Sequence, residues 1–198
     1  MSKYDKTTII LIAGDAGSGK STTGKIIRQI LGCHSYYTPF AAPLKQMAAN
    51  VLGVSASRFN DYDFKNTHRP LLIALADSYK ELYGEEVFAL KNVQAILDAE
   101  NPAGVFVADD IRYPYEYEVM KDTFTNVQLI EVLAPERALK GIGHSSEGAD
   151  WSFVTDRIVI GNDLPVDLSA LTDNLKLVLN LHGLPVLADE FIQELPQS

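Results

Sequence analysis

The sequence predicts an α/β fold, with a mostly parallel central sheet covered by helices on both faces in a three-layer sandwich. Short apolar runs typical of buried strands alternate along the chain with longer segments of helical periodicity. The first of these runs leads through a glycine-rich loop directly into a helix. The length of 198 residues and the hydrophobic fraction of 46% suit one domain with a substantial core. We therefore expect a single domain over residues 1–198.

The first strand, loop and helix form the most informative stretch. Residues 7–12 (TTIILI) are apolar and largely β-branched, as in a strand. Residues 14–21 (GDAGSGKS) match the pattern G-x-x-x-x-G-K-[ST], and a helical stripe follows until Gly32, a natural C-cap. A strand, a glycine loop and a helix in this order indicate a P-loop. The fold class is thus refined to a P-loop NTPase-type sandwich.

The chemistry of such a loop requires these residue types. Glycines allow backbone N–H groups to converge on phosphate oxygens, and the helix N-terminus favours the same anion. Lys20 is expected to reach the β- and γ-phosphates, and the Ser21 hydroxyl to hold Mg²⁺. ATP and Mg²⁺ are therefore the expected cofactors; the alternative is a glycine turn that binds nothing. The expected nucleotide-binding residues are Gly14, Asp15, Ala16, Gly17, Ser18, Gly19, Lys20, Ser21 and Thr22.

Helices dominate the next part of the chain, after a short strand and turn in residues 33–40. They are expected at residues 41–52, 68–83 and 85–100. Residues 55–67 are polar and aromatic with little periodicity, which indicates a loop or short helical turns. Lys45 lies near a helix start, where the helix dipole disfavours a cation. A bound anion would explain Lys45, although a solvated lysine is the alternative. We expect this insert, about residues 41–101, to form the acceptor side of a core made of residues 5–40 and 103–182.

A second candidate site follows the apolar strand at residues 104–108. Asp109, Asp110 and Arg112 come directly after it, at the strand end where α/β sheets place Mg²⁺ chemistry. A simple helix N-cap role for Asp110 is the alternative. The metal-binding residues are therefore expected to be Ser21 and Asp110, with the choice between Asp109 and Asp110 left open.

The remaining third continues the alternation of strands and helices. Strands are expected at residues 127–133 and 156–160, and helices at residues 114–122, 168–181 and 185–195. The short segment 134–142 carries Arg137 and Lys140 and ends at a glycine. Its size suits a small lid closing over phosphates, within a lid region of about residues 135–150. An exposed charged helix is the alternative.

The charge and composition limit the kinds of partner that the protein can bind. Lys and Arg total 17 and Asp and Glu total 26, so the net charge is −9. This balance argues against a general surface for nucleic acid or anionic membranes, but it allows a local basic pocket for a small phosphorylated substrate. Cys33 is the sole cysteine, and neither a signal-peptide pattern nor a membrane-length apolar run is present. We expect a cytoplasmic protein.

Several short motifs in order carry a family resemblance that covers about Thr7 to Leu181. They are the P-loop, Phe40-Ala41-Ala42-Pro43-Leu44-Lys45, Asp110-Ile111-Arg112-Tyr113-Pro114-Tyr115-Glu116, His144-Ser145-Ser146-Glu147, and Asp156-Arg157-Ile158-Val159-Ile160-Gly161-Asn162-Asp163. Together they resemble the phage-type deoxynucleoside monophosphate kinases, within the P-loop nucleoside monophosphate kinase group. The resemblance implies phosphoryl transfer from ATP to a deoxynucleoside monophosphate. It also makes a homodimer a reasonable expectation, and host cytoplasm the location if the protein is phage-encoded.

The resemblance also implies roles for individual residues. Lys45 and Arg112 would contact the acceptor's phosphate, while Asp110 and Glu116 would organise that pocket. His144 and Glu147 would order the base of the lid or face the nucleotide. The expected catalytic residues are Lys20, Arg112, Arg137 and Lys140. The expected substrate-binding residues are Phe40, Lys45, Arg69, Asp110, Arg112, Glu116, His144 and Glu147. The chain departs from the family in its short length, in having Lys80 where a second arginine is expected, and in a lid with only two basic residues.

Three alternatives stay open at this point. The first is another P-loop small-molecule kinase, such as a dephospho-coenzyme A or phosphomevalonate kinase. The second is a nucleotide-binding regulatory protein that hydrolyses ATP slowly. The third is a structural protein with a degenerate P-loop, against which the intact Gly14, Gly19, Lys20 and Ser21 argue. Base specificity is not predicted, because the aromatic candidates can stack on any base; they are Tyr36, Tyr37, Phe59, Tyr62 and Phe64.

Overall fold

The computed structural model describes residues 6–135, 149–162 and 168–187 of the chain. Its centre is a five-stranded parallel sheet in the order β2-β3-β1-β4-β5. The strands are β1 (Thr8–Ala13), β2 (Ser35–Tyr37), β3 (Val105–Ala108), β4 (Asn126–Leu133) and β5 (Ile158–Gly161). The helices are α1 (Lys20–Leu31), α2 (Ala42–Leu52), α3 (Tyr62–Thr67), α4 (Arg69–Tyr83), α5 (Val87–Leu97), α6 (Pro114–Thr123) and α7 (Leu168–Leu181).

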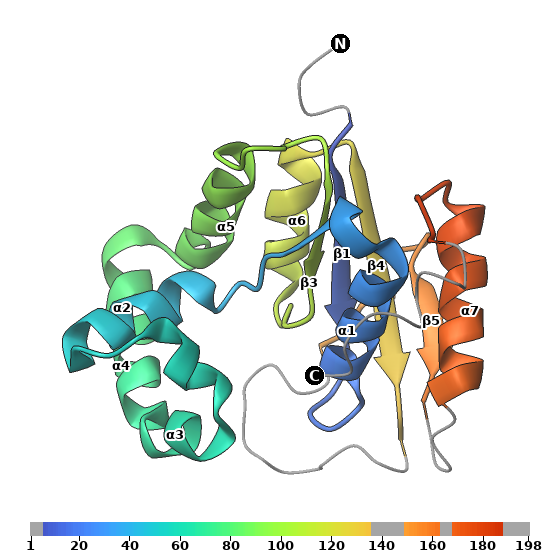
Figure 1. Ribbon diagram of the computed structural model, residues 1–198. Coiled ribbons are helices and arrows are strands. Elements are labelled where there is room, and N and C mark those ends of the chain that lie inside the picture. Colours follow the sequence, from blue (N-terminus) through green and yellow to red (C-terminus); the bar gives the residue numbers. More distant parts are fainter. Residues whose placement is uncertain (1–5, 136–148, 163–167, 188–198) are drawn as a thin grey trace.

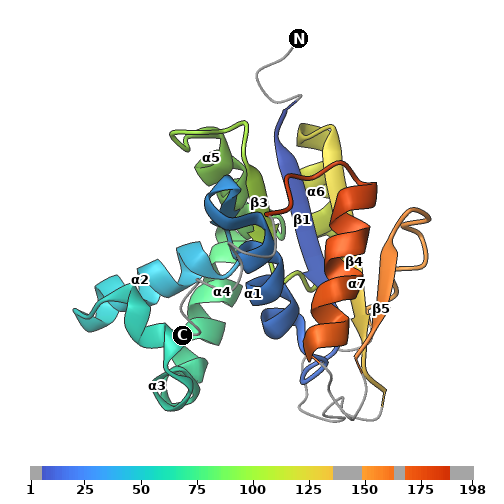
Figure 2. The same ribbon diagram turned by 45° about the vertical axis from the view of Figure 1, so that its right-hand side comes forward.

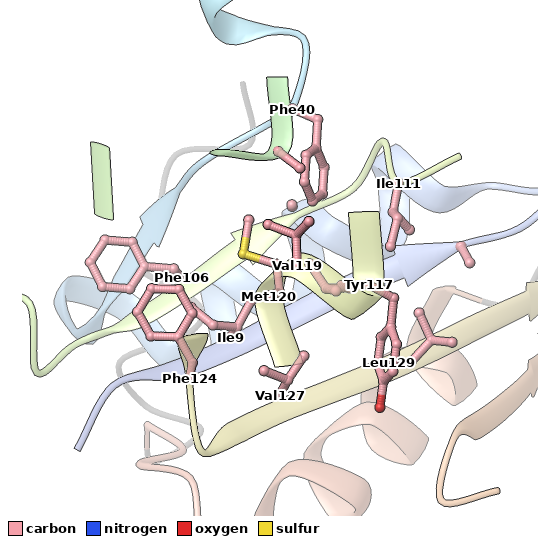
Figure 3. Close-up of a cluster of buried hydrophobic side chains, with 14 of the residues drawn as sticks. Ile9, Phe40, Phe106, Ile111, Tyr117, Val119, Met120, Phe124, Val127 and Leu129 are labelled. Carbon is pink, nitrogen blue, oxygen red and sulfur yellow. The ribbon is translucent and has the colours of Figure 1, made fainter. Parts of the chain in front are cut away.

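Helices cover both faces of this sheet, giving three layers (Figure 1). On one face, α1 and α7 pack against the sheet through Ile27, Ile30 and Leu175, all fully buried. On the other face, α5 and α6 contribute Ile96 and Met120 to a second cluster. Figure 3 shows Met120 in that cluster beside Phe124, Phe106 and Ile9. Burial of both faces explains why the inner strands β1 and β3 are continuous apolar runs without alternation.

The remaining helices form a group that we call the helical lobe, residues 42–83. It comprises α2, a 3₁₀ helix (Ala56–Asn60), α3 and α4, and it lies to one side of the sheet in both Figure 1 and Figure 2. Its own small core holds Ala48, Ala49, Phe59 and Leu72. The lobe therefore places its side chains beside the ends of the strands rather than over a face of the sheet.

The parallel register brings the carboxyl ends of the inner strands together. Ala13 at the end of β1 pairs with Glu131 on β4, and Leu11 pairs with Ala108 at the end of β3. The loop after β1, the residues after β3 and the end of β4 consequently meet at one edge of the sheet, as expected for ligand sites in open α/β sheets.

The predicted α/β sandwich is confirmed, and its strands and helices fall within two or three residues of the expected bounds. Residues 55–67 form the 3₁₀ helix and α3, in agreement with the predicted short helical turns. The expected helix at 185–195 is not present in residues 185–187, and residues 188–198 lie outside the described part. Most of the expected lid, residues 136–148, also lies outside it. No helix in the described ranges is long and apolar enough to cross a membrane.

Candidate active site

The loop between β1 and α1 has the backbone geometry that its glycines predict. Gly14, Gly17 and Gly19 have φ values of 141°, 80° and 99°, which are strained for residues with a side chain. A Cβ on Gly14 would lie 2.4 Å from the carbonyl oxygen of Val132 in β4. Glycine is thus required where the loop passes β4, and the loop is held close to the sheet edge.

Lys20 closes this loop on itself. Its Nζ donates hydrogen bonds to the carbonyl oxygens of Gly14 (2.6 Å) and Asp15 (2.7 Å). Burial lowers the pKa of the Lys20 ammonium, and the nearby charge of Arg112 lowers it further. The charges of Asp15, Asp109 and Asp110 oppose this shift. A phosphate at the loop would add a direct anionic partner for this half-buried cation.

The loop is also hydrogen-bonded to the residue that follows the edge strand β5. The Nδ2 of Asn162, directly after β5, donates to the Ser18 carbonyl oxygen at 2.8 Å, and Asn162 is buried. The Ser18 hydroxyl is buried without a hydrogen-bond partner among the described residues. Asn162 belongs to the last of the motifs in the sequence but was not predicted as a site residue, because nothing in the sequence links it to Ser18.

Asp109 lies at the end of β3 against α1. Its Oδ1 accepts a hydrogen bond from the Tyr37 hydroxyl at 2.7 Å. Burial and this hydrogen bond raise the pKa of Tyr37, so the phenol stays protonated and keeps donating. A Cβ on Gly24 of α1 would lie 2.9 Å from the Asp109 Cβ, which shows how closely β3 and α1 approach.

Asp110 serves a different element. Its Oδ1 and Oδ2 accept hydrogen bonds from the backbone N–H groups of Phe40 (2.8 Å) and Ala41 (3.0 Å), at the start of α2. Burial raises the pKa of Asp110, and these two backbone bonds oppose that shift. The side chain therefore anchors the helical lobe to the end of β3, and Asp109 is the better candidate for the metal.

Replacing Asp110 with asparagine should lower the free energy of unfolding by about 2 kcal/mol, because the amide cannot accept both backbone N–H groups and one would stay unpaired. Urea denaturation of Asp110→Asn measures this, with Asp122→Asn as a control at an exposed position. Equal stability of the two variants would contradict the anchoring role.

Glu116 fixes the loop that carries Arg112. Its Oε2 accepts hydrogen bonds from the backbone N–H groups of Arg112 (2.7 Å) and Tyr113 (3.0 Å), at the start of α6. The side chain is 6% exposed, and burial raises its pKa to about 7. The Arg112 guanidinium stays exposed, where it can bind an anion. Glu116 thus positions Arg112 through the backbone.

Two adjoining cavities occupy this edge of the sheet. The P-loop cavity, about 320 Å³, is lined by the loop and the ends of β3 and β4. The lobe cavity, about 440 Å³, lies between the helical lobe and the loop after β3. Both volumes fall in the range of small-molecule sites. Lys65, Asp110 and Arg112 line both cavities.

The lobe cavity combines cations with aromatic rings. Its basic lining residues in the described part are Lys45, Lys65, Arg69, Lys80 and Arg112. Its aromatic lining residues are Phe40, Phe88, Tyr113 and Tyr115. The rings of Tyr113 and Tyr115 stack with centroids 5.2 Å apart, and the Lys80 Nζ lies 4.7 Å from the Tyr113 centroid. Cations suit an anionic group and rings suit a planar one, so the cavity fits a ligand with both.

The structure brings most of the predicted residues together. Of the predicted nucleotide-binding residues, Gly14, Asp15, Ala16, Lys20 and Ser21 line the P-loop cavity, whereas Gly17, Ser18, Gly19 and Thr22 are absent from the lining. The predicted substrate residues Phe40, Lys45, Arg69, Asp110, Arg112 and Glu116 all line the lobe cavity. Arg137, Lys140, His144 and Glu147 lie outside the described residues.

Several lining residues were not predicted as site residues; they include Phe88, Tyr113 and Tyr115 of the lobe cavity and the charged residues Lys65 and Glu131. Lys65 sits in a segment without clear periodicity, and only its basic charge could have drawn attention to it. Glu131 was taken as part of a buried strand. It lines the P-loop cavity and forms an ion pair with Arg157, whose Nε lies 2.7 Å from its Oε2.

The donor atoms near α1 fit Mg²⁺. Ser21 and Asp109 line the same cavity. Mg²⁺ prefers oxygen ligands and is commonly held by one or two carboxylates, waters and the phosphates of the substrate. No group of three or more His, Cys, Asp or Glu in the described ranges could hold a metal ion by itself. A site completed by phosphate oxygens is consistent with both observations.

These features define an α/β fold of the P-loop NTPase type, with a parallel sheet flanked by helices. No family model matches the chain, and no curated protein matches it. Among solved structures, an unliganded sugar kinase from Janibacter sp. HTCC2649 is 15% identical and has a TM-score of 0.40, with 90% of this chain and 95% of that chain covered. A gluconokinase from Sinorhizobium meliloti 1021 is 16% identical with a TM-score of 0.42, covering 89% and 96%.

Proposed function

We propose that the protein is an ATP-dependent kinase that transfers a phosphoryl group to a phosphorylated small molecule, with a deoxynucleoside monophosphate as the acceptor. The observation that carries the proposal is the pair of adjoining cavities that share Lys65, Asp110 and Arg112. A P-loop cavity suits the triphosphate of the donor. A second, cation-lined cavity that shares lining residues with the first suits a phosphate that receives the transferred group.

The residues divide the work of phosphoryl transfer between the two cavities. Lys20 would exchange its two carbonyl partners for the β- and γ-phosphates of ATP, while Lys45 and Arg112 would bind the acceptor's phosphate. Ser21 and Asp109 would hold Mg²⁺, which neutralises phosphate charge when bound. Arg137 and Lys140 are proposed to add charge from the lid.

The transfer itself needs no catalytic base. An oxygen of the acceptor's phosphate is already anionic at neutral pH and forms the new bond to the γ-phosphorus. The bond from the γ-phosphorus to the β,γ-bridging oxygen breaks, and its electron pair leaves with ADP. Positioning and charge neutralisation therefore account for catalysis.

A nucleoside monophosphate is favoured over other phosphorylated acceptors by the aromatic lining. Tyr113 and Tyr115 are half-buried and offer ring faces on which a planar base can stack, while Phe40 and Phe88 are buried in the apolar wall of the cavity. The preference for deoxyribose rests on the resemblance of the motifs at Phe40–Lys45 and Asp110–Glu116 to the phage-type kinases. Other small-molecule kinases also need cations to bind a phosphorylated acceptor, so their acceptors are included in the same experiment.

The test is an ADP-release assay with ATP, Mg²⁺ and a panel of acceptors. The panel holds the four deoxynucleoside monophosphates, 5-substituted pyrimidine forms, ribonucleotides, dephospho-coenzyme A, phosphomevalonate, gluconate and a control without acceptor. We expect turnover with one or more deoxynucleotides and little without an acceptor. Equal ADP release in every well would indicate a regulatory ATPase, and turnover with a non-nucleotide alone would overturn the proposed acceptor.

Lys45 provides a second prediction within this assay. Lys45→Met should raise the KM of the acceptor by roughly 10-fold, since one charged contact to phosphate is lost, and leave the KM of ATP nearly unchanged. Lys91→Met, on α5 and outside both cavity linings, is the matched control. An unchanged acceptor KM would mean that Lys45 is merely solvated.

A further inference from the structure

Lys65 occupies the junction of the two cavities, yet it comes from a helix of six residues outside the sheet. It lines the P-loop cavity together with Lys20 and Ser21, and it also lines the lobe cavity together with Lys45. No other residue of the 3₁₀ helix or of α3 lines either cavity. The short helix therefore reaches the site through this one side chain.

The helix that carries Lys65 is firmly anchored. The Asp61 Oδ1 caps it by accepting a hydrogen bond from the Phe64 N–H at 2.8 Å. The Phe64 ring packs edge-on against Phe59 at 5.3 Å and lies 4.2 Å from the His68 ring, measured between centroids. Phe59 itself is 1% exposed in the core of the lobe. The backbone at Lys65 is thereby fixed, and the ammonium is directed to the junction rather than placed there by a flexible loop.

The surroundings of the Lys65 ammonium are unfavourable for a cation on its own. Burial lowers the pKa of Lys65, and the charges of Lys45, Arg112 and Arg69 lower it further. Asp110 is the carboxylate that counters them, but its oxygens already accept the N–H groups of Phe40 and Ala41. In the described part of the chain, the Lys65 ammonium has no hydrogen bond or ion pair.

An anion at the junction of the two cavities would stabilise the cluster of cations around Lys65. A phosphate in the lobe cavity alone would be met by Lys45 and Arg112, and a triphosphate in the P-loop cavity alone would be met by Lys20. Lys65 lines both spaces, so it faces the position between them where a group passes from donor to acceptor.

We propose that Lys65 is a catalytic residue that contacts both the acceptor's phosphate and the phosphoryl group in transfer. This inference rests on the proposed kinase function. As the acceptor oxygen bonds to the γ-phosphorus and the β,γ-bridging oxygen leaves with ADP, the Lys65 ammonium stays in contact with equatorial oxygens of the moving group. No proton leaves Lys65 in this step; its role is to neutralise charge.

The first experiment compares Lys65→Met with the wild type in steady-state kinetics on the best acceptor of the panel. We expect kcat to fall on the order of 10²-fold, since a charge contact present in the transition state is lost. Lys65→Arg should recover at least about a tenth of the wild-type kcat, because it keeps the charge. Lys121→Met, exposed on α6, is the control and should match the wild type.

Thermal unfolding separates this role from a structural one. Lys65→Met relieves repulsion among the cations, so its midpoint should equal or exceed that of the wild type. A lowered midpoint with a parallel loss of kcat would indicate a structural role and overturn the proposal. A raised acceptor KM with unchanged kcat would also overturn it, because it would confine Lys65 to acceptor binding.

A binding measurement gives a readout without turnover. A dinucleoside pentaphosphate that joins adenosine to the preferred nucleoside spans both cavities and places phosphate at the junction. We expect Lys65→Met to weaken its binding at least about 10-fold and to weaken binding of ATP alone less than about 3-fold. Equal affinities of wild type and variant for the pentaphosphate would overturn the inference. Failure of the wild type to transfer to any acceptor would instead show, before any variant is made, that the proposed function is wrong.

Discussion

Replacing Lys20 with alanine should lower kcat on the order of 10³-fold, while the protein stays folded. The expected loss is large because Lys20 is the P-loop cation that we propose contacts the transferred phosphate. In the structure its Nζ lies within hydrogen-bonding distance of the Gly14 and Asp15 carbonyl oxygens, at the base of the phosphate site. Steady-state ADP release at saturating ATP measures the effect.

The matched control for this variant is Lys25→Ala, the same substitution on the exposed side of α1. Lys25 lines neither cavity, so kcat should be unchanged. The two variants should have similar circular dichroism and unfolding midpoints, since removing the Lys20 charge also removes its burial cost. Near-normal turnover of Lys20→Ala would contradict the assignment of residues 14–21 as a phosphate-binding P-loop.

The Glu116→Gln variant should be more stable than the wild type at high pH, and this advantage should shrink as the pH is lowered. The pKa of Glu116 is raised from 4.5 to about 7 by burial, so the folded state holds its proton more tightly than the unfolded state. Below about pH 4.5, Glu116 is protonated in both the folded and the unfolded state, so the raised pKa does not affect the free energy of unfolding. As the pH rises to about 7, the free energy of unfolding of the wild type falls by on the order of 3 kcal/mol. The glutamine variant has no such loss.

Glutamine suits this position because its carbonyl oxygen can still accept the Arg112 and Tyr113 N–H groups. Urea unfolding of wild type and Glu116→Gln at about pH 5 and about pH 8 should show the difference between them growing in favour of the variant. Glu118→Gln, exposed on the same helix, should show no such trend. A difference that is independent of pH would contradict the raised pKa of Glu116.

The fold could be predicted from the sequence because local patterns decide it. Buried parallel strands are continuous apolar runs, and Gly14, Gly17 and Gly19 mark a loop that other residues cannot form. Lys45 and Arg112, which their motifs singled out because each follows a recognisable strand or helix start, both line the lobe cavity, and their roles there stay predictions.

The parts that could not be predicted depend on contacts between distant segments. The sequence presents Asp109 and Asp110 as equivalent neighbours, and only the positions of Tyr37 and of the N-terminus of α2 separate their roles. The Asn162–Ser18 hydrogen bond and the position of Lys65 on the P-loop cavity likewise depend on contacts between distant segments. Side-chain patterns report which face of an element is buried, but not which polar groups meet across the fold.

The close approach of Gly24 to Asp109 has a consequence for how this protein could diverge. A methyl group at position 24 would meet the Asp109 Cβ at 2.9 Å, so alanine there would require β3 and α1 to move apart. Such a shift would carry the carboxylate away from Ser21 and alter the proposed metal site. Position 24 should therefore stay glycine during evolution as long as position 109 carries a side chain. A glycine one turn into the first helix would then be as informative as the P-loop lysine in finding distant relatives that keep the chemistry.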